Sequence, residues 1–434
     1  MITNFHHSDD YQKLANSLIP AGAHTYSKGK DQFPAQGPKA VVRGKGARVY
    51  DVDGNEFIDW GMGLSSVLLG HAYEPILEVV REELDNGVNF ILPSHLEARV
   101  AKLLTTQIPS AQMVKFGKNG SNATTSAIRL ARAYTKKDIV LKCQDNPFLA
   151  IDDWFICDTP MNSGIPESQQ SLVKNFSYNN INEVKELVQT HKGKIACIIL
   201  EPVMVDEPLD GFLHSLRSIC DAEKIVLIFD EIRTGFRVHP KGAQYKYGVT
   251  PDLSSFGKAI ANGFSASALV GKREIMELGG LEHTEDRVFL LSSTYGGETH
   301  HLRAIERNIE ILNADDFAVT KHIYAVGKKI KESYNQITQE LGLEKHTQII
   351  GLDANATLVF KDLYLRTYFL QEMIKEGILM QAISPSYSHR KAEVEQTIHA
   401  FSVALRKVQK ATTTGTVQEL LHGMPIKPVF RKKN

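Results

Sequence analysis

A buried strand that ends in two acidic residues constrains the fold of this chain more than any other feature. Residues Val226–Phe229 form a short, continuous apolar run, which is typical of a strand buried in a parallel sheet. Asp230 and Glu231 follow directly, at the carboxyl end of the strand, where open α/β sheets bind their ligands. A second short strand, at Leu253–Phe256, leads into a turn that carries Lys258. We therefore expect Asp230 and Lys258 to stand at neighbouring strand ends.

An acid and a lysine in this arrangement suggest covalent chemistry on a carbonyl group. A lysine can form a Schiff base with a carbonyl if burial or a nearby cation lowers its pKa. The 28 positions between Asp230 and Lys258 leave room for one crossover between adjacent strands. Taken singly, a solvated acid and a surface lysine are the simpler interpretations. Together they match pyridoxal phosphate (PLP), which needs a carboxylate at its ring nitrogen and an amine for its aldehyde.

The two motifs around these residues carry a family resemblance. Asp230–Arg237 reads D-E-I-R-T-G-F-R and Phe256–Gly263 reads F-G-K-A-I-A-N-G. Both strongly resemble the class III (ω-) aminotransferases of PLP fold type I, above all glutamate-1-semialdehyde aminomutase, and the likeness runs from about Ile19 to about Val408. The resemblance implies an α/β protein with a large domain built on a mainly parallel, doubly wound sheet, plus a small α/β domain from the N- and C-terminal segments. We place the segments at 1–70, 71–300 and 301–434.

A candidate phosphate site precedes these motifs. Val114–Phe116 reads as a strand and is followed by Gly120-Ser121 and a helix with apolar residues at Ala127, Leu130, Ala131 and Tyr134. Unpaired amides and the helix dipole at such an N-terminus suit a phosphate, although an ordinary Ser N-cap is an equal alternative. The position matches the family's phosphate loop, with Asn122 where relatives carry Glu.

The resemblance also assigns the other residues of the site. Glu201 follows the apolar strand Ile198–Leu200 and matches a family glutamate near the cofactor. Ile232 is expected on one face of the PLP ring and Phe148 on the other, although Phe148 could instead be a core aromatic. Thr294 matches a threonine that reaches the phosphate of the partner subunit, which implies a homodimer with shared active sites. The implied PLP-binding residues are Gly120, Ser121, Phe148, Glu201, Asp230, Ile232, Lys258 and Thr294.

The implied reaction is transfer of an amino group between small molecules. Lys258 would hold PLP and then act as general base and acid, while Asp230 would keep the ring nitrogen charged. In glutamate-1-semialdehyde aminomutase an arginine in a G-V-N-S-P-V-R segment binds the substrate carboxylate. The matching segment here is Gly22–Lys28, with Lys28 at the arginine position, and a lysine lacks the bidentate fork.

The polar residues of this segment suit a ligand rich in hydroxyl groups. We assign His24, Tyr26 and Lys28 to the substrate. With the unusual loop Asn146–Asp153, they resemble relatives that aminate oxidised sugars for cell-surface glycans such as lipopolysaccharide. The expected acceptor is an oxidised sugar or sugar acid, for example 8-oxo-3,8-dideoxy-manno-octulosonate, and the expected donor is L-glutamate. An aminomutase, a PLP-dependent racemase or decarboxylase, and a non-catalytic PLP-fold binding protein remain alternatives.

Composition narrows the possible partners. The 50 Lys and Arg residues balance the 50 Asp and Glu residues, so net charge gives no reason to expect nucleic acid or an anionic membrane. The four scattered cysteines form no C-x-x-C pair, and we expect buried thiols. The adjacent His300 and His301 point in different directions on a helix, so we expect no metal. The N-terminus lacks the apolar core of a signal peptide, and no apolar run approaches the ~20 residues of a membrane span, so we expect a cytoplasmic protein.

Overall fold

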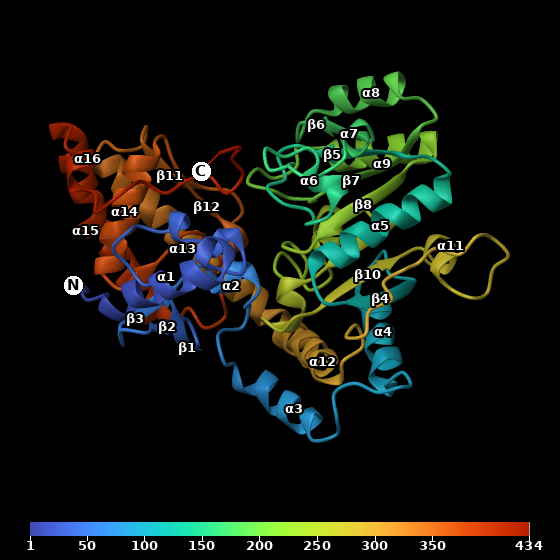
Figure 1. The fold of residues 1–434 in the computed structure, drawn as a ribbon, viewed down its shortest axis with the longest axis horizontal. Coiled ribbons are helices and arrows are strands. Elements are labelled where there is room, and N and C mark those ends of the chain that lie inside the picture. The colour runs from blue at the N-terminus through green and yellow to red at the C-terminus, as the bar shows by residue number, and fades with distance from the viewer. Residues whose placement is uncertain (434) are drawn as a thin grey trace. The chain divides into compact units, whose positions relative to one another are not determined.

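In the computed structural model, which describes residues 1–433, the buried run Val226–Phe229 lies in the middle of a seven-stranded sheet (Figure 1). The strand order is β4-β10-β9-β8-β7-β5-β6. Strands β5 to β9 pair in parallel, and β10 is antiparallel to both β4 and β9. The strands are β4 (Met113–Gly117), β5 (Ile139–Cys143), β6 (Val173–Phe176), β7 (Ile195–Leu200), β8 (Val226–Glu231), β9 (Leu253–Phe256) and β10 (Ser267–Gly271). This mainly parallel α/β sheet confirms the expected fold class.

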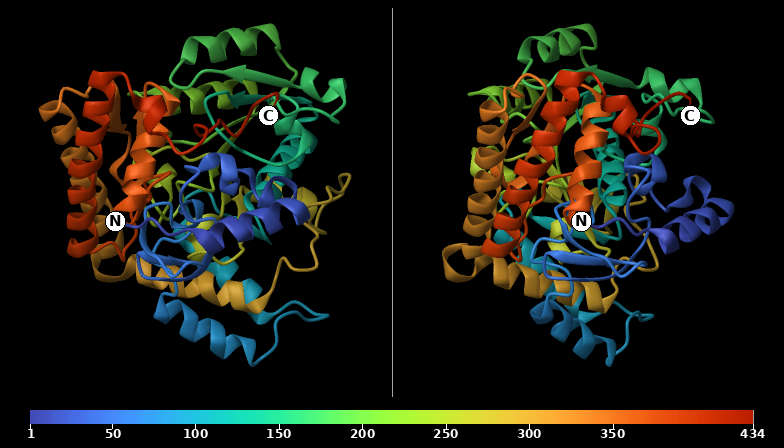
Figure 2. Two further views of the ribbon diagram at one scale, coloured as in Figure 1. Left: turned by 60° about the vertical axis from the view of Figure 1, so that its left-hand side comes forward. Right: turned by 90° about the vertical axis from the view of Figure 1, so that its left-hand side faces the viewer.

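Helices flank this sheet and belong to the same unit, Glu74–Thr320, which we call unit 2. The central helix α5 buries Ala127, Leu130 and Ala131 as its apolar pattern predicted, whereas Tyr134 is exposed. Helices α3 and α12 lie side by side in the views of Figure 2. The helices are α3 (Glu74–Leu84), α4 (His95–Gln107), α5 (Gly120–Thr135), α6 (Asp153–Ile156), α7 (Glu167–Ser171), α8 (Ile181–Thr190), α9 (Phe212–Glu223), α10 (Ala243–Tyr247), α11 (Arg273–Met276) and α12 (Thr299–Asn313).

Unit 1 combines Met1–Tyr73 with the chain from Lys321 onward. It holds a four-stranded sheet of order β1-β2-β3-β13 and a two-stranded sheet β11-β12. Its core contains Trp60, Tyr334, Phe369 and Phe401. The elements are α1 (His6–Leu18), β1 (Val41–Lys45), β2 (Arg48–Asp51), β3 (Glu56–Asp59), α2 (Met62–Ser65), most of α13 (Ala318–Glu340), β11 (Thr347–Ile350), β12 (Thr357–Phe360), α14 (Leu363–Lys375), β13 (Ile378–Leu379), α15 (Lys391–Thr414) and α16 (Val417–Leu420).

The division between the units differs from the one expected near residue 300. Beyond Glu298 the chain first forms two α-helices, since α12 ends at Asn313 and α13 begins at Ala318. Helix α12 packs against α3 and α4, so it stays with the large sheet, and unit 1 resumes only at Lys321.

The turn α2 has an unusual backbone. Met62, Gly63, Leu64 and Ser65 all have positive φ, at 41°, 59°, 57° and 70°. Left-handed backbone costs an L-residue roughly 1–2 kcal/mol. The turn is held at its start by Asp59, whose carboxylate accepts hydrogen bonds from the amides of Gly61 and Met62. The small, glycine-containing segment is therefore a fixed, strained turn.

Among the described residues, no helix combines the length and apolar character needed to cross a membrane.

Candidate active site

The sheet brings three side chains, Asp230, Glu201 and Lys258, to one edge. Strands β5, β7, β8 and β9 are neighbours and parallel, so their carboxyl ends meet. Asp230 is the second-to-last residue of β8 and pairs in register with Ser255 of β9. Glu201 directly follows β7, and Lys258 follows β9 after one glycine. The sequence-based expectation that Asp230 and Lys258 stand at adjacent strand ends agrees with this arrangement.

Asp230 and Glu231 have opposite environments although they are adjacent. Both are buried, and they point to opposite faces of the sheet. Glu231 accepts hydrogen bonds from the amides of Ala243 (2.6 Å) and Gln244 (3.0 Å), and from the side chains of Gln244 (3.1 Å) and Thr234 (3.1 Å). Among the described residues, the Asp230 carboxylate accepts only one, from the amide of Ile232 at 2.9 Å. Glu231 is thus a structural acid, and Asp230 retains unused acceptor capacity.

The charge of Asp230 is poorly compensated. Burial and the neighbouring charge of Glu201 raise its pKa from 3.8 to about 8, against the opposing effects of the Ile232 amide, Lys258 and Arg233. A buried carboxylate without a close cation is costly. This side chain therefore fits a ligand that brings a positive charge to the end of β8.

Lys258 occupies a strained backbone position at the sheet edge. It begins a 3₁₀ turn, Lys258–Ala261, with φ of +48°, a region that side chains other than glycine rarely adopt. Burial lowers the pKa of its ammonium group, Arg233 and Arg237 act in the same direction, and Glu201 and Asp230 oppose them. The condition that we set for a nucleophilic lysine, a lowered pKa, is met.

An ion pair beside these residues was not anticipated from the sequence. Arg233 Nε donates to Glu201 Oε2 at 2.8 Å, and Glu201 is almost fully buried. Asn146, from the loop after β5, accepts a hydrogen bond from the Glu201 amide at 3.3 Å. The position of Arg233, three residues after Asp230 in the same motif, was the sequence signal that could have indicated a cation near the site. No local pattern marked Asn146, because the fold rather than the sequence brings it to β7.

The phosphate loop lies against the same edge. Helix α5 begins at Gly120, and its N-cap is Asn119 rather than Ser121, which corrects the alternative of a Ser cap. Asn119 and Asn122 form a capping box, so Asn122 satisfies backbone amides at the start of the helix. Ser121 is free of that task, and its hydroxyl accepts from the Ile151 amide at 3.0 Å.

Two glycines bring the loop, Asp230 and Lys258 together around Ile232. A Cβ on Gly120 would lie 3.1 Å from three carbons of the Ile232 side chain, and a Cβ on Gly257 would lie 3.1 Å from its Cδ1. The backbone on either side of Ile232 is therefore as close as glycine allows. The predicted phosphate loop and the turn before Lys258 meet at the residue that follows the two acids.

The loop that carries Phe148 is fastened to the first turns of α5. Thr124 Oγ1 donates to the Leu149 carbonyl at 2.8 Å, and Thr125 Oγ1 donates to Asp152 at 2.6 Å. Phe148 keeps 46% of its surface exposed and makes an edge contact with Phe155. It is not a core aromatic, so an exposed ring remains for stacking, and its assignment to PLP stays a prediction.

The other predicted residues belong to other segments of the chain. Thr294 is exposed, and its carbonyl accepts from Asn89 Nδ2 at 3.0 Å. His24, Tyr26 and Lys28 belong to unit 1, where Tyr26–Lys28 form a short 3₁₀ turn. All three side chains are exposed, and none makes a hydrogen bond or ion pair with another part of residues 1–433. Their assignment to the substrate stays a prediction.

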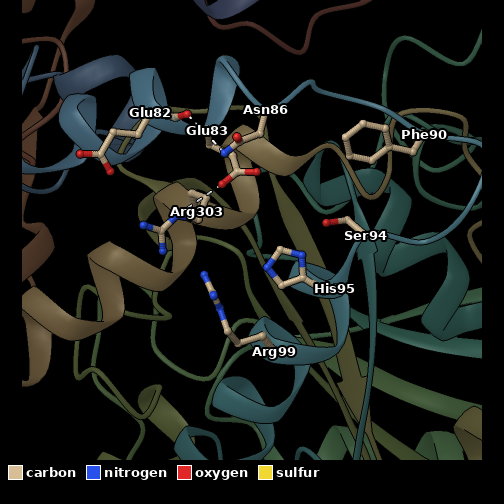
Figure 3. Close-up of a pocket in the computed structure, with 8 residues that line it drawn as sticks. All are labelled: Glu82, Glu83, Asn86, Phe90, Ser94, His95, Arg99 and Arg303. Atoms are coloured by element: carbon tan, nitrogen blue, oxygen red, sulfur yellow. Dashed lines mark hydrogen bonds and ion pairs between the residues drawn. The ribbon is translucent and has the colours of Figure 1, made fainter.

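A separate pocket of about 560 Å³ opens on unit 2 (Figure 3). In Figure 3, Arg303 of α12 faces Glu83 of α3, and Phe90 stands at the rim. None of the residues assigned to PLP lines it; the lining residues are Glu82, Glu83, Asn86, Phe90, Ser94, His95, Arg99 and Arg303.

Comparison with known proteins identifies the family. Residues 27–405 match the family model described as aminotransferase class-III. The chain is a class-III aminotransferase. It is 30% identical over 91% of its length to the glutamate-1-semialdehyde 2,1-aminomutase of Methanosphaera stadtmanae, 97% of which is covered. It is 32% identical, over the same share, to the 3-aminobutyryl-CoA aminotransferase of Cloacimonas acidaminovorans, with 96% of that protein covered.

Solved structures support the assignment to this family. An omega-transaminase from Sphaerobacter thermophilus superposes with a TM-score of 0.85 at 25% identity, covering 93% of this chain and 98% of that one. The protein is thus a PLP-dependent transaminase of fold type I, as its two motifs predicted, rather than a non-catalytic binding protein.

The residues of this aminotransferase fit PLP. The uncompensated Asp230 suits a protonated pyridine nitrogen, and Lys258 with its lowered pKa suits an aldehyde. The close backbone approach at Gly120 and Gly257 packs the phosphate loop and the turn before Lys258 against Ile232, the residue assigned to one face of the ring. PLP, when bound, supplies an electron sink for the carbon that carries the amino group.

Proposed function

We propose that this aminotransferase moves an amino group from L-glutamate to an oxidised sugar or sugar acid for cell-surface glycan synthesis, with 8-oxo-3,8-dideoxy-manno-octulosonate as the type of acceptor. The observation that carries the proposal is the turn at His24, Tyr26 and Lys28. Three exposed polar side chains that have no partner within residues 1–433 can bind hydroxyl groups and one carboxylate. The loop at Asn146–Asp153 also differs from that of the aminomutases.

In this proposal the residues at the sheet edge have distinct roles. Asp230 holds the proton on the pyridine nitrogen, and Lys258 binds the cofactor and then takes and returns the substrate proton. Gly120 and Ser121 bind the phosphate with the first amides of α5. Glu201 holds Arg233 in place beside them.

The test separates the two halves of the reaction. Purified PLP-loaded protein is mixed with L-glutamate, and the release of 2-oxoglutarate is measured in stoichiometric amount. The glutamate-treated protein, which now holds the amino group, is then offered a panel of sugar aldehydes, sugar-acid aldehydes and simple oxo acids, and the aminated product is identified by mass spectrometry. Amination of simple oxo acids with no sugar accepted would overturn the substrate class and leave the transaminase intact.

A matched pair of lysines tests the substrate turn. Lys28→Ala should raise the KM for an anionic acceptor about tenfold, because a lost charged hydrogen bond costs roughly 1.5–3 kcal/mol. Lys30→Ala, an exposed lysine two positions away, should leave the KM unchanged. Equal effects of the two substitutions would remove Lys28 from the site.

A glutamate-1-semialdehyde 2,1-aminomutase activity is the second candidate, because relatives of that name match at 30% identity over most of the chain. Such an enzyme converts its substrate without an external donor. Lys28, where the aminomutases carry arginine, weighs against it. Conversion of glutamate-1-semialdehyde to its isomer, with no release of 2-oxoglutarate from glutamate, would favour the aminomutase.

The proposed assembly is a homodimer in which Thr294 serves the phosphate of the other subunit. Support comes from the surface beside Thr294. Phe90, Ile91 and Leu92 are consecutive and 53%, 100% and 73% exposed, and Asn89 links their loop to the Thr294 carbonyl. An apolar run this exposed is typical of a surface covered by a partner.

Sedimentation tests the dimer. Ile91→Asp should shift the protein toward monomer, whereas Leu209→Asp, at another exposed leucine of unit 2, should not. A second test mixes the inactive variants Lys258→Ala and Thr294→Ala, because one site of a mixed dimer would then carry neither lesion. A wild-type protein that sediments as a monomer at working concentration would refute the shared site.

We also place the protein in the cytoplasm. All four cysteines are buried free thiols, which is the usual state in a reducing compartment.

A further inference from the structure

A cluster of charged and imidazole groups lies behind the phosphate loop and has no task in the reaction. Lys118 Nζ contacts Glu298 Oε2 at 2.6 Å and His301 Nδ1 at 3.3 Å. Lys118 is the residue between β4 and the cap of α5, and Glu298 directly precedes α12. The ion pair thus joins two segments that are 180 residues apart in the sequence.

The cluster has the composition of a cation site, but the Lys118 ammonium group already supplies the positive charge. Ligand atoms of Glu298, His300 and His301 lie within 4.8 Å of one another. The Lys118 ammonium already contacts two of these three side chains, so the positive charge that a metal would bring is present. His301 is fully buried, and burial with the adjacent Lys118 lowers its pKa to about 3. It is therefore a neutral acceptor for the ammonium group.

Lys118 is also fixed through its backbone. Its amide donates to Asn122 Oδ1 at 3.2 Å, within the capping box of α5. Its carbonyl accepts from Ser265 Oγ at 2.8 Å, in the loop after the Lys258 turn. Movement of the Lys118 side chain would thus be transmitted to the loop that precedes Ser121.

The Glu298 end of the ion pair is also held, by hydrogen bonds of the next residue. Thr299, next to Glu298, donates from its amide to the Val88 carbonyl at 3.0 Å and from its hydroxyl to the Gly87 carbonyl at 2.8 Å. The same loop holds Thr294 through Asn89. Glu298 therefore belongs to a rigid support for the segment that carries Thr294.

We propose that Lys118 is a positioning residue that fixes two phosphate-binding elements at once: the loop Asn119–Ser121 of its own subunit and the segment Ser292–Glu298 that is offered to the partner. This inference rests on the proposed dimer, in which Thr294 serves the partner's phosphate. Lys118 itself does not touch the cofactor, because its ammonium is occupied by Glu298 and His301.

The test compares Lys118→Met with Lys115→Met. Lys115 lies on β4, three residues before Lys118, is exposed and forms no ion pair among the described residues, so it is a matched control. Apo-protein is titrated with PLP by absorbance, and the ³¹P resonance of bound PLP reports the phosphate environment. Lys118→Met should weaken PLP binding at least tenfold and move the ³¹P resonance, and Lys115→Met should change neither. Unchanged binding and an unchanged resonance in Lys118→Met would overturn the inference.

A double-mutant cycle separates the ion pair from general loss of stability. Glu298→Gln should weaken PLP binding as Lys118→Met does, and the double variant should be no weaker than either single variant. Additive losses would show that the two residues act independently and would refute the proposed connection.

Mixed dimers test the connection to the partner. In a dimer of one Lys118→Met subunit and one wild-type subunit, one site has an altered loop and the other receives Thr294 from the altered subunit. Both sites should then bind PLP more weakly than wild-type sites. A titration with half of the sites at wild-type affinity would overturn the dual role. If the wild-type protein sediments as a monomer, the assembly itself fails, and that result is independent of Lys118.

Discussion

Asp230→Asn should change how the stability of the PLP-free protein depends on pH. The carboxyl group is 3% exposed, has one hydrogen bond and lies near Glu201, and its pKa is about 8 instead of 3.8. Between these two values the folded protein holds a proton that the unfolded chain releases. Stability from this group is therefore present at low pH and is lost as the pH rises toward 8.

The expected size follows from the raised pKa of Asp230. For a group with a folded pKa of about 8, the free energy of unfolding of the wild-type protein should fall by about 2 kcal/mol between pH 6 and pH 8. The asparagine variant keeps the shape of the side chain and cannot titrate. Its stability relative to wild type should thus increase by about 2 kcal/mol over the same interval.

Urea unfolding of both PLP-free proteins at a series of pH values measures this difference, with β8 followed by hydrogen exchange to assign it to unit 2. Asp210→Asn, an exposed acid of the same unit, is the control and should show no such trend. Because Glu201 raises the pKa of Asp230, Glu201→Gln should move the transition to lower pH. Asp230 faces a positive charge once PLP is bound, so the trend should vanish in the loaded protein. A stability difference that does not change between pH 6 and pH 8 would refute our account of Asp230.

Three further outcomes are expected. Lys258→Ala should fold but bind PLP only reversibly. Borohydride reduction followed by peptide mass spectrometry should then find a PLP adduct on Lys258 in the wild-type protein and no adduct in the variant. An unchanged adduct at another lysine would contradict the assignment. Ser254→Ala should lower the free energy of unfolding by about 1–3 kcal/mol because Ser254 Oγ hydrogen-bonds to Ser110 and Gln244. Ser255→Ala should be nearly neutral because its buried hydroxyl has no partner in the part of the chain that the structure describes, and equal losses would contradict this. Leu64→Gly should stabilise the protein by about 1 kcal/mol by relieving its positive φ, and Leu14→Gly, in the exposed face of α1, should destabilise it by a similar amount, as thermal unfolding would show.

Local sequence patterns sufficed for strands β4, β7, β8 and β9 and for the two motifs. The continuous apolar run of β8 and the Gly-Lys turn after β9 each depend on neighbouring residues, so they could be read directly. The boundary near residue 300 could not, because α12 is assigned by its packing on α3 and α4 rather than by its own composition. Asn146, Arg233 and Lys118 were missed for the same reason, since their partners lie 55, 32 and 180 residues away.

The pair Asp230-Glu231 shows where sequence reasoning needs the fold. Two adjacent acids at a strand end are equivalent in the sequence, and only their alternation across the sheet separates them. The chain after β8 folds back so that Gln244, Ala243 and Thr234 satisfy Glu231 on one face. On the other face Asp230 keeps a single hydrogen bond, beside Glu201 and in register with the unpartnered Ser255. The Glu231 carboxylate thus holds the loop that follows β8, and the Asp230 carboxylate remains available to a ligand. The same alternation on β9 separates Ser254 from Ser255, so the Asp230 face of both strands carries the unsatisfied polar groups that a charged cofactor would meet.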